Sequence, residues 1–151
     1  MREHGPVLGR VCMALLGDAG AAERALERVA AEAGAAKLEA ETDVLVRLMG
    51  MARVACANQL SKLPIRTSTG PRPDEPAPAT ARHRSSLPRE ALRARAVLGR
   101  LKPTEREAVI LHIVGGLDAA HVAQACGTDL ATARGRIARG VAQLVEEEKH
   151  R

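Results

Sequence analysis

The sequence contains no phenylalanine, tyrosine or tryptophan among its 151 residues. Aromatic side chains bury the largest areas in most protein cores, so a core of this chain has to be made of aliphatic side chains and alanine. Small helical bundles can be built in that way. Because each of these side chains buries little area, we expect a fold of only marginal stability.

Reactive and metal-binding side chains are few and scattered. The cysteines are odd in number and far apart, without a CxxC spacing: Cys12, Cys56 and Cys126. This pattern argues against a disulfide framework and against a metal site. The histidines are dispersed as well: His4, His83, His112, His121 and His150. Because no nucleophile–base set, glycine-rich phosphate loop or pair of acids accompanies them, we expect no enzyme and no cofactor.

Long apolar stretches are also missing. The sequence has no run of about 18 consecutive apolar residues and no pattern of a secretory signal peptide. We therefore expect a protein of the reducing cytoplasm that makes no contact with a membrane.

Positive charge is concentrated in the middle of the chain. Residues 1–60 carry seven Lys or Arg and eight Asp or Glu, a net charge of −1. Residues 61–100 carry nine and three, a net of +6, and residues 101–151 carry seven and seven, a net of zero. A basic excess attracts nucleic acid without selecting a sequence, and the alternative for part of it is a solvated linker.

The basic middle segment also holds most of the prolines. Between residues 61 and 89 the helical periodicity stops, and prolines stand among Ser, Thr, Gly and Arg. Such a segment buries too little apolar surface to offset the entropy of ordering it. The predicted fold is therefore all-α, with helical bundles at residues 5–62 and 90–147 joined by a flexible linker at residues 63–89.

The N-terminal part has the periodicity of three amphipathic helices. The first ends at Gly17, the second follows Asp18 as its N-cap, and the third runs from about Thr42 to Leu60. Their apolar stripes can bury one another as a small bundle.

The C-terminal part has the punctuation of a helix-turn-helix. A helix from Glu90 to Leu101 precedes one that begins at Thr104, with Glu107 as a capping-box partner. Asp118 then caps a short helix that ends near Cys126, and Asp129 caps a longer one that reaches about Val145. A short helix, a tight turn with glycine and a longer helix is the pattern of this DNA-binding motif.

The longer helix has an apolar seam and a basic side. The seam consists of Leu130, Ala133, Ile137 and Val141. A hydroxyl and three cations lie off the seam: Thr132, Arg134, Arg136 and Arg139. These side chains suit phosphates and base edges of a major groove, and the alternative is a solvated basic face on an ordinary bundle.

This C-terminal segment resembles region four of bacterial sigma factors, above all of the extracytoplasmic-function group. Residues that match the family's pattern are Leu101, Pro103, Arg106, Gly116-Leu117-Asp118, Val122-Ala123, Gly127, Asp129, Thr132-Ala133-Arg134, Arg136 and Arg139. His121 replaces the usual Glu and Gly140 the usual Ala. A LuxR-type regulator has a similar opening, so the resemblance supports helix-turn-helix DNA binding more strongly than it supports a sigma factor.

The N-terminal half resembles region two of the same family more weakly. Leu16-Gly17-Asp18 with Ala22-Glu23, and later Met51-Ala52-Arg53, follow the family's pattern. Arg24 stands where the family usually has Asp, and the usual Trp is missing near Arg47. Since melted promoter DNA is held largely by stacking, a half without aromatic residues is poorly equipped for promoter melting.

The resemblance implies a transcription regulator with defined partners. It places Thr132, Arg134, Arg136 and Arg139 on an upstream promoter element, and it places Glu23, Arg24 and Glu27 on core RNA polymerase. An anti-sigma factor is a further implied partner. The alternatives are a sigma-like interaction protein that does not melt promoters, and a stand-alone LuxR-type regulator.

Overall fold

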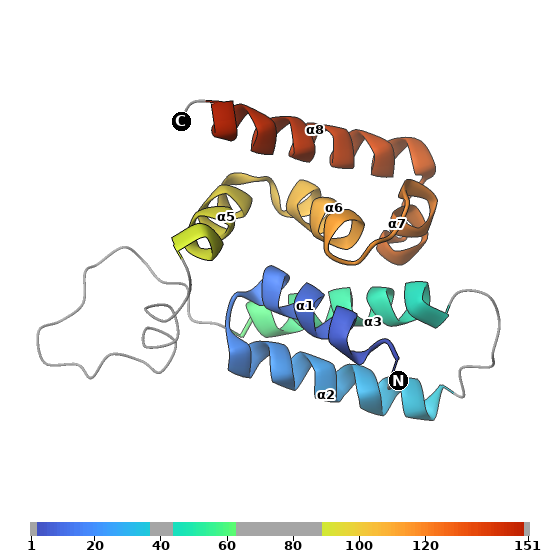
Figure 1. Cartoon of the computed structure of the whole chain (residues 1–151). Coiled ribbons are helices and arrows are strands. Elements are labelled where there is room, and N and C mark those ends of the chain that lie inside the picture. The colour runs from blue at the N-terminus through green and yellow to red at the C-terminus, as the bar shows by residue number, and fades with distance from the viewer. Residues whose placement is uncertain (1–2, 37–43, 63–88, 150–151) are drawn as a thin grey trace, which may run out of the picture.

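The structure of the protein, a computed structural model, describes residues 3–36, 44–62 and 89–149, which are all-α as predicted (Figure 1). The N-terminal bundle consists of α1 (Gly5–Leu16), α2 (Ala19–Ala35) and α3 (Val44–Leu60). The C-terminal bundle consists of α5 (Arg89–Arg100), α6 (Pro103–Ile113), α7 (Ala119–Cys126) and α8 (Leu130–Lys149). Residues 63–88 of the predicted linker lie outside the described residues, and Arg89 already belongs to α5.

The connection between α1 and α2 has the two signals that the sequence predicts. Gly17 ends α1 in the left-handed conformation, with φ 64°, and its N–H donates to the carbonyl oxygen of Met13 at 2.8 Å. The Asp18 carboxylate then caps α2 by accepting the Ala21 N–H at 2.7 Å. Because glycine adopts this conformation without strain, the chain turns here within two residues.

The core of the N-terminal bundle is made of aliphatic, sulfur-containing and alanine side chains. Its largest buried members are Leu8, Val11, Cys12, Val29, Leu48, Met49 and Cys56. The thiols of Cys12 and Cys56 are hydrogen-bonded to each other, and this bond together with burial raises the pKa of Cys56. Both residues are free cysteines and act as small apolar groups that join α1 to α3.

The start of α6 differs from the prediction. The helix begins at Pro103 with Lys102 as N-cap, and no side chain caps it, so the capping box from Thr104 to Glu107 is wrong. Proline suits the first helical position because its φ is already helical and an N–H there would have no partner in the helix. Glu107 instead accepts a hydrogen bond from Arg53 of α3 at 3.4 Å.

The apolar seam of α8 is shifted from the predicted one. Ala133 is buried and Ile137 and Val141 are partly buried, but Leu130 is 39% exposed. Helical side chains lean toward the N-terminus, so Leu130, as the first residue of α8, points past the surface that the rest of the seam covers. Gly140 takes a buried place in the seam and lies against Val109 of α6.

The two bundles are packed against each other through α3 and α7, with α1 against α6 (Figure 1). At Gly50 the backbones come close, since a Cβ on this residue would lie only 3.4 Å from the carbonyl oxygen of Ala125. The ion pair between Arg53 and Glu107 lies in the same junction. The buried side chains of both halves therefore form one continuous core, while the division into residues 5–62 and 90–147 stays a prediction.

Candidate nucleic-acid interface

The turn between α7 and α8 is fixed by local hydrogen bonds. Gly127 ends α7 with φ 62°, and the Thr128 N–H donates to the carbonyl oxygen of Ala123 at 2.9 Å. At the other end of α7, the Asp118 carboxylate accepts the His121 N–H at 2.8 Å. The predicted boundaries of this short helix are confirmed, and the helix-turn-helix is present with α8 as its second helix.

Asp129 caps α8 with both carboxylate oxygens. One accepts the Thr132 N–H at 2.8 Å and the other accepts the Thr132 hydroxyl at 2.6 Å. These hydrogen bonds, that of the hydroxyl first, lower the pKa of Asp129. The hydroxyl proton of Thr132 is thus committed to the cap, and only its oxygen lone pairs remain for a ligand.

The two aspartate caps give the motif a pH dependence. The Asp118 carboxylate also lies 2.9 Å from His121 Nδ1, and its pKa is lowered mainly by the His121 N–H. A carboxylate whose pKa is lower in the folded than in the unfolded chain stabilises the fold above the unfolded pKa of about 3.9. This contribution is lost as the pH falls through that value toward the folded pKa.

We expect the double variant Asp118→Asn, Asp129→Asn to lose less stability than the wild type between pH 5 and 3, values that bracket the ordinary aspartate pKa of about 3.9. Asparagine is a good N-cap that does not titrate in this range. The helix caps are therefore kept, while the dependence of stability on the protonation of these two carboxylates disappears. Chemical denaturation at several pH values measures this. Parallel stability curves for the two proteins would show that the caps do not carry the acid sensitivity.

The predicted DNA-contact residues of α8 differ in their surroundings. Arg134 is exposed, and Arg136 is partly buried. The pKa of the Cys126 thiol in α7 is raised by burial, and the positive charge of Arg136 lowers it by a smaller amount. The side chain of Arg139 is 64% exposed but is paired with Glu105 of α6, whose Oε1 lies 2.9 Å from its Nε.

Glu105 is the residue of this site that the sequence reasoning missed. It is buried, although it carries a charge, and it lies on the face of α6 that also holds Ala108 and Val109. Glu105 stands three positions before Ala108 and four before Val109, and so lies on the same apolar helix face. A charged residue on such a face is a signal that could have identified it, since a charged side chain is buried only with a partner.

The C-terminal helices match a known family. Residues 91–144 match the family model described as Sigma-70, region 4. This segment is similar to a sigma-70 region 4. The match covers the helix-turn-helix, most of α5 and α8 up to Leu144, and it agrees with the resemblance predicted from the sequence.

The whole chain is similar in fold to solved structures, of which one is a sigma factor. One is the sigma factor RpoE in complex with the anti-sigma factor NepR from Bartonella quintana, with a TM-score of 0.71, 19% identity, and 97% of this chain and 92% of that chain covered. Another is CnrH in complex with the cytosolic domain of CnrY, with a TM-score of 0.72, 17% identity, and 99% and 84% covered. No curated protein gives a significant match.

The family match over residues 91–144 and the fold of the whole chain both agree with the resemblance to a sigma factor. Sigma factors are regulators and not enzymes. In the described part of the chain, no helix is sufficiently long and apolar for a membrane span.

The residues predicted to contact polymerase lie far from region 4. Glu23, Arg24 and Glu27 are exposed on α2, which packs on α1 and α3. In Figure 1, α2 and α8 form the two outer edges of the stack of helices. The structure thus does not bring the predicted polymerase residues and the predicted DNA residues into one site.

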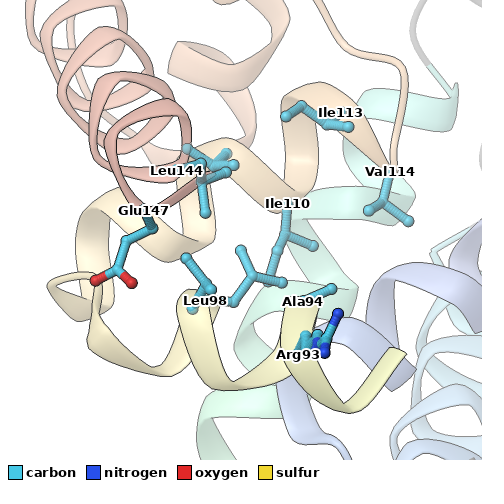
Figure 2. Close-up of a pocket in the computed structure, with 10 residues that line it drawn as sticks. Arg93, Ala94, Leu98, Ile110, Ile113, Val114, Leu144 and Glu147 are labelled. Carbon is cyan, nitrogen blue, oxygen red and sulfur yellow. The ribbon is translucent and has the colours of Figure 1, made fainter. Parts of the chain in front are cut away.

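The C-terminal bundle also has an apolar pocket of about 300 Å³ between α5, α6 and α8 (Figure 2). Val97, Leu98, Ile110 and Leu144 are among its lining residues, and Ile113 at its edge is 59% exposed. At one side, Arg100 donates to both carboxylate oxygens of Glu147 at 2.6 Å. An apolar depression with a charged edge is a surface suited to another protein, and none of the predicted DNA-contact residues lines it.

Proposed function

We propose that the protein recognises an upstream promoter element through α8 and binds core RNA polymerase, in the manner of an extracytoplasmic-function sigma factor. The observation that carries the proposal is the helix-turn-helix within a region 4, whose second helix has a fixed start and a basic outer side. In such motifs the second helix enters the major groove with its N-terminal residues, while the first crosses the backbone.

The arrangement of α8 supports base reading near its start. The Asp129 cap fixes the first turn, and the seam against α6 and α7 fixes the rotation of the helix. Arg134 and Arg136 follow within the next turn and a half. We assign base contacts to Arg136 and phosphate contacts to Arg134 and Arg139, with Thr132 at the edge of the contact.

Two surfaces are proposed for protein partners. Polymerase is assigned to the side of α2 with Glu23, Arg24 and Glu27, because these three side chains are exposed and available to a partner. An anti-sigma factor is proposed as a further partner, since both similar structures are complexes, one with the anti-sigma factor NepR and the other with CnrY.

A second candidate function is regulation without promoter melting. The whole sequence has no aromatic residue, and a melted strand is held mainly by stacking of its bases on aromatic side chains. The protein would then occupy polymerase or a promoter without opening the DNA, or act as a stand-alone regulator of the LuxR type.

The decisive experiment uses the full chain and two measurements. Sequencing of duplexes retained from a random pool should show one enriched motif, and pull-down from purified components should show binding to core RNA polymerase. Transcription from a duplex with the enriched motif, compared with the same duplex pre-opened at the start site, then separates the two candidates. Activity on the pre-opened template alone would support the function without melting. Absence of both an enriched motif and polymerase binding would refute the proposal.

We expect Arg24→Asp to strengthen binding to core polymerase about 1.5- to fivefold, the range of one exposed charge pair. The substitution places the family's usual charge on the exposed side of α2. Biolayer interferometry with core polymerase measures the change, and Arg28→Asp serves as a control because Arg28 is engaged with Glu32 on the same helix. Equal effects of both variants would point to overall charge and not to a contact at residue 24.

A further inference from the structure

Glu105 is the buried charged residue of the described chain, with only 6% of its surface exposed. It stands in the first turn of α6, outside α8 and outside the predicted DNA contacts. Its Oε1 accepts a hydrogen bond from Nε of Arg139 at 2.9 Å. A carboxylate so far out of water needs a charged partner, and Arg139 is that partner.

Two glycines allow this contact. Gly140 brings α8 against α6, since a Cβ at this position would overlap Cγ2 of Val109 and would lie 3.5 Å from the carbonyl oxygen of Glu105. Gly135 leaves room for the far end of Arg139, because a Cβ there would lie 3.2 Å from Nη1. The side chain of Arg139 therefore points back along α8 toward the start of the helix, with Nε beside Glu105 and Nη1 beside Gly135.

The pairing leaves the outer edge of the guanidinium available. A guanidinium has five N–H groups, and the carboxylate takes the one on Nε. The side chain of Arg139 is 64% exposed while that of Glu105 is 7% exposed, so the cation lies above the carboxylate and faces solvent. An arginine held in this way loses little side-chain entropy when its outer edge binds a phosphate.

We propose that Glu105 is a positioning residue for DNA binding: it holds Arg139 in the orientation in which the guanidinium contacts a phosphate beside the major groove. The inference rests on the proposed DNA binding of α8. It assigns a role in promoter recognition to a residue of α6 that does not itself touch DNA.

The sign of the effect separates positioning from simple electrostatics. If Glu105 only neutralised charge near the DNA, its removal would tighten DNA binding, because a negative charge close to phosphates would be gone. If it positions Arg139, its removal weakens binding although the protein becomes more positive.

The test uses the full chain and the duplex that the wild type enriches from a random pool, with the dissociation constant measured at several salt concentrations. Glu105→Met fills the buried space without a hydrogen-bond acceptor, and Glu105→Gln keeps an acceptor for Nε. We expect Glu105→Met to weaken binding about three- to tenfold, the factor for ordering one long side chain. Its salt dependence should be shallower by up to about one unit of slope, the share of one phosphate contact. Glu105→Gln should bind more tightly than Glu105→Met and less tightly than the wild type, because a neutral amide oxygen holds Nε less firmly than a carboxylate.

A double variant links the effect to Arg139. Glu105→Met combined with Arg139→Gln should bind the duplex as well as Arg139→Gln alone, because there is then no guanidinium to position. Thermal unfolding of each variant shows whether it is folded, and should Glu105→Met unfold, Glu105→Gln still decides by the sign of its effect. Unchanged or tighter binding by the folded Glu105 variants would overturn the positioning role alone. Absence of sequence-selective binding by the wild type would overturn both this role and the proposed function.

Discussion

Replacing Gly140 with alanine is expected to destabilise the protein by about 1–3 kcal/mol, although alanine is the better helix former. Gly140 lies where α8 crosses α6, and the added methyl group would overlap Cγ2 of Val109. Val109 is 1% exposed and β-branched, so few low-energy rotamers are open to it when the methyl group is added. Alanine is the usual residue of the sigma family at this position, yet here we expect it to be harmful.

Denaturant unfolding monitored by circular dichroism measures the effect, and two further variants make it specific. The double variant Val109→Ala, Gly140→Ala should be more stable than the sum of the two single effects predicts, because the smaller side chain at residue 109 removes the overlap. Gly99→Ala in α5, where nothing lies within 4 Å of a Cβ, should stabilise the chain by a few tenths to about 1 kcal/mol. Stabilisation by Gly140→Ala would mean that the helices can separate at this crossing without cost.

The helix starts that the sequence predicted correctly are those with a strong local signal. Asp18, Asp118 and Asp129 each cap the helix that follows, because the interaction joins a carboxylate to an N–H only three residues away. Thr104 has the same kind of pattern and does not cap. There the neighbouring Pro103 is itself a good first residue, so the helix starts one position earlier.

The features that the sequence did not reveal depend on which helices meet. The contact of α3 with α7 needs Gly50 and Ala125, which are far apart in the chain and are ordinary helix residues when taken alone. Glu105 was missed for the same reason, because its partner Arg139 follows 34 residues later. Helical periodicity predicts which face of a helix is buried and does not predict its neighbour.

The sequence groups the predicted DNA-contact residues by type, and the structure separates them by their neighbours. Thr132, Arg134, Arg136 and Arg139 were grouped because all lie off the apolar seam of α8. In the structure two of the four already have partners, Thr132 in the Asp129 cap and Arg139 on Glu105. Local pairing thus divides a group that the sequence pattern treats as equivalent. The roles of the other two residues, Arg134 and Arg136, can be compared directly by mutating each of them.

Arg136→Ala is expected to relax the base selection of α8 at one position by about 1–3 kcal/mol, the value of one bidentate arginine–guanine contact. Arg136 follows the capped first turn and is partly buried, so its side chain has less freedom than a fully exposed arginine on the same helix. Arg134 is the matched control, since it is exposed on the same helix two residues earlier. Arg134→Ala should weaken binding to all duplexes alike and lower the salt slope by about one unit.

The measurement is enrichment from a random duplex pool, followed by dissociation constants for the enriched sequence and its single-base variants at two salt concentrations. A motif that is unchanged by Arg136→Ala and altered by Arg134→Ala would reverse the two roles, and loss of affinity without any change of motif in both would leave α8 with phosphate contacts only.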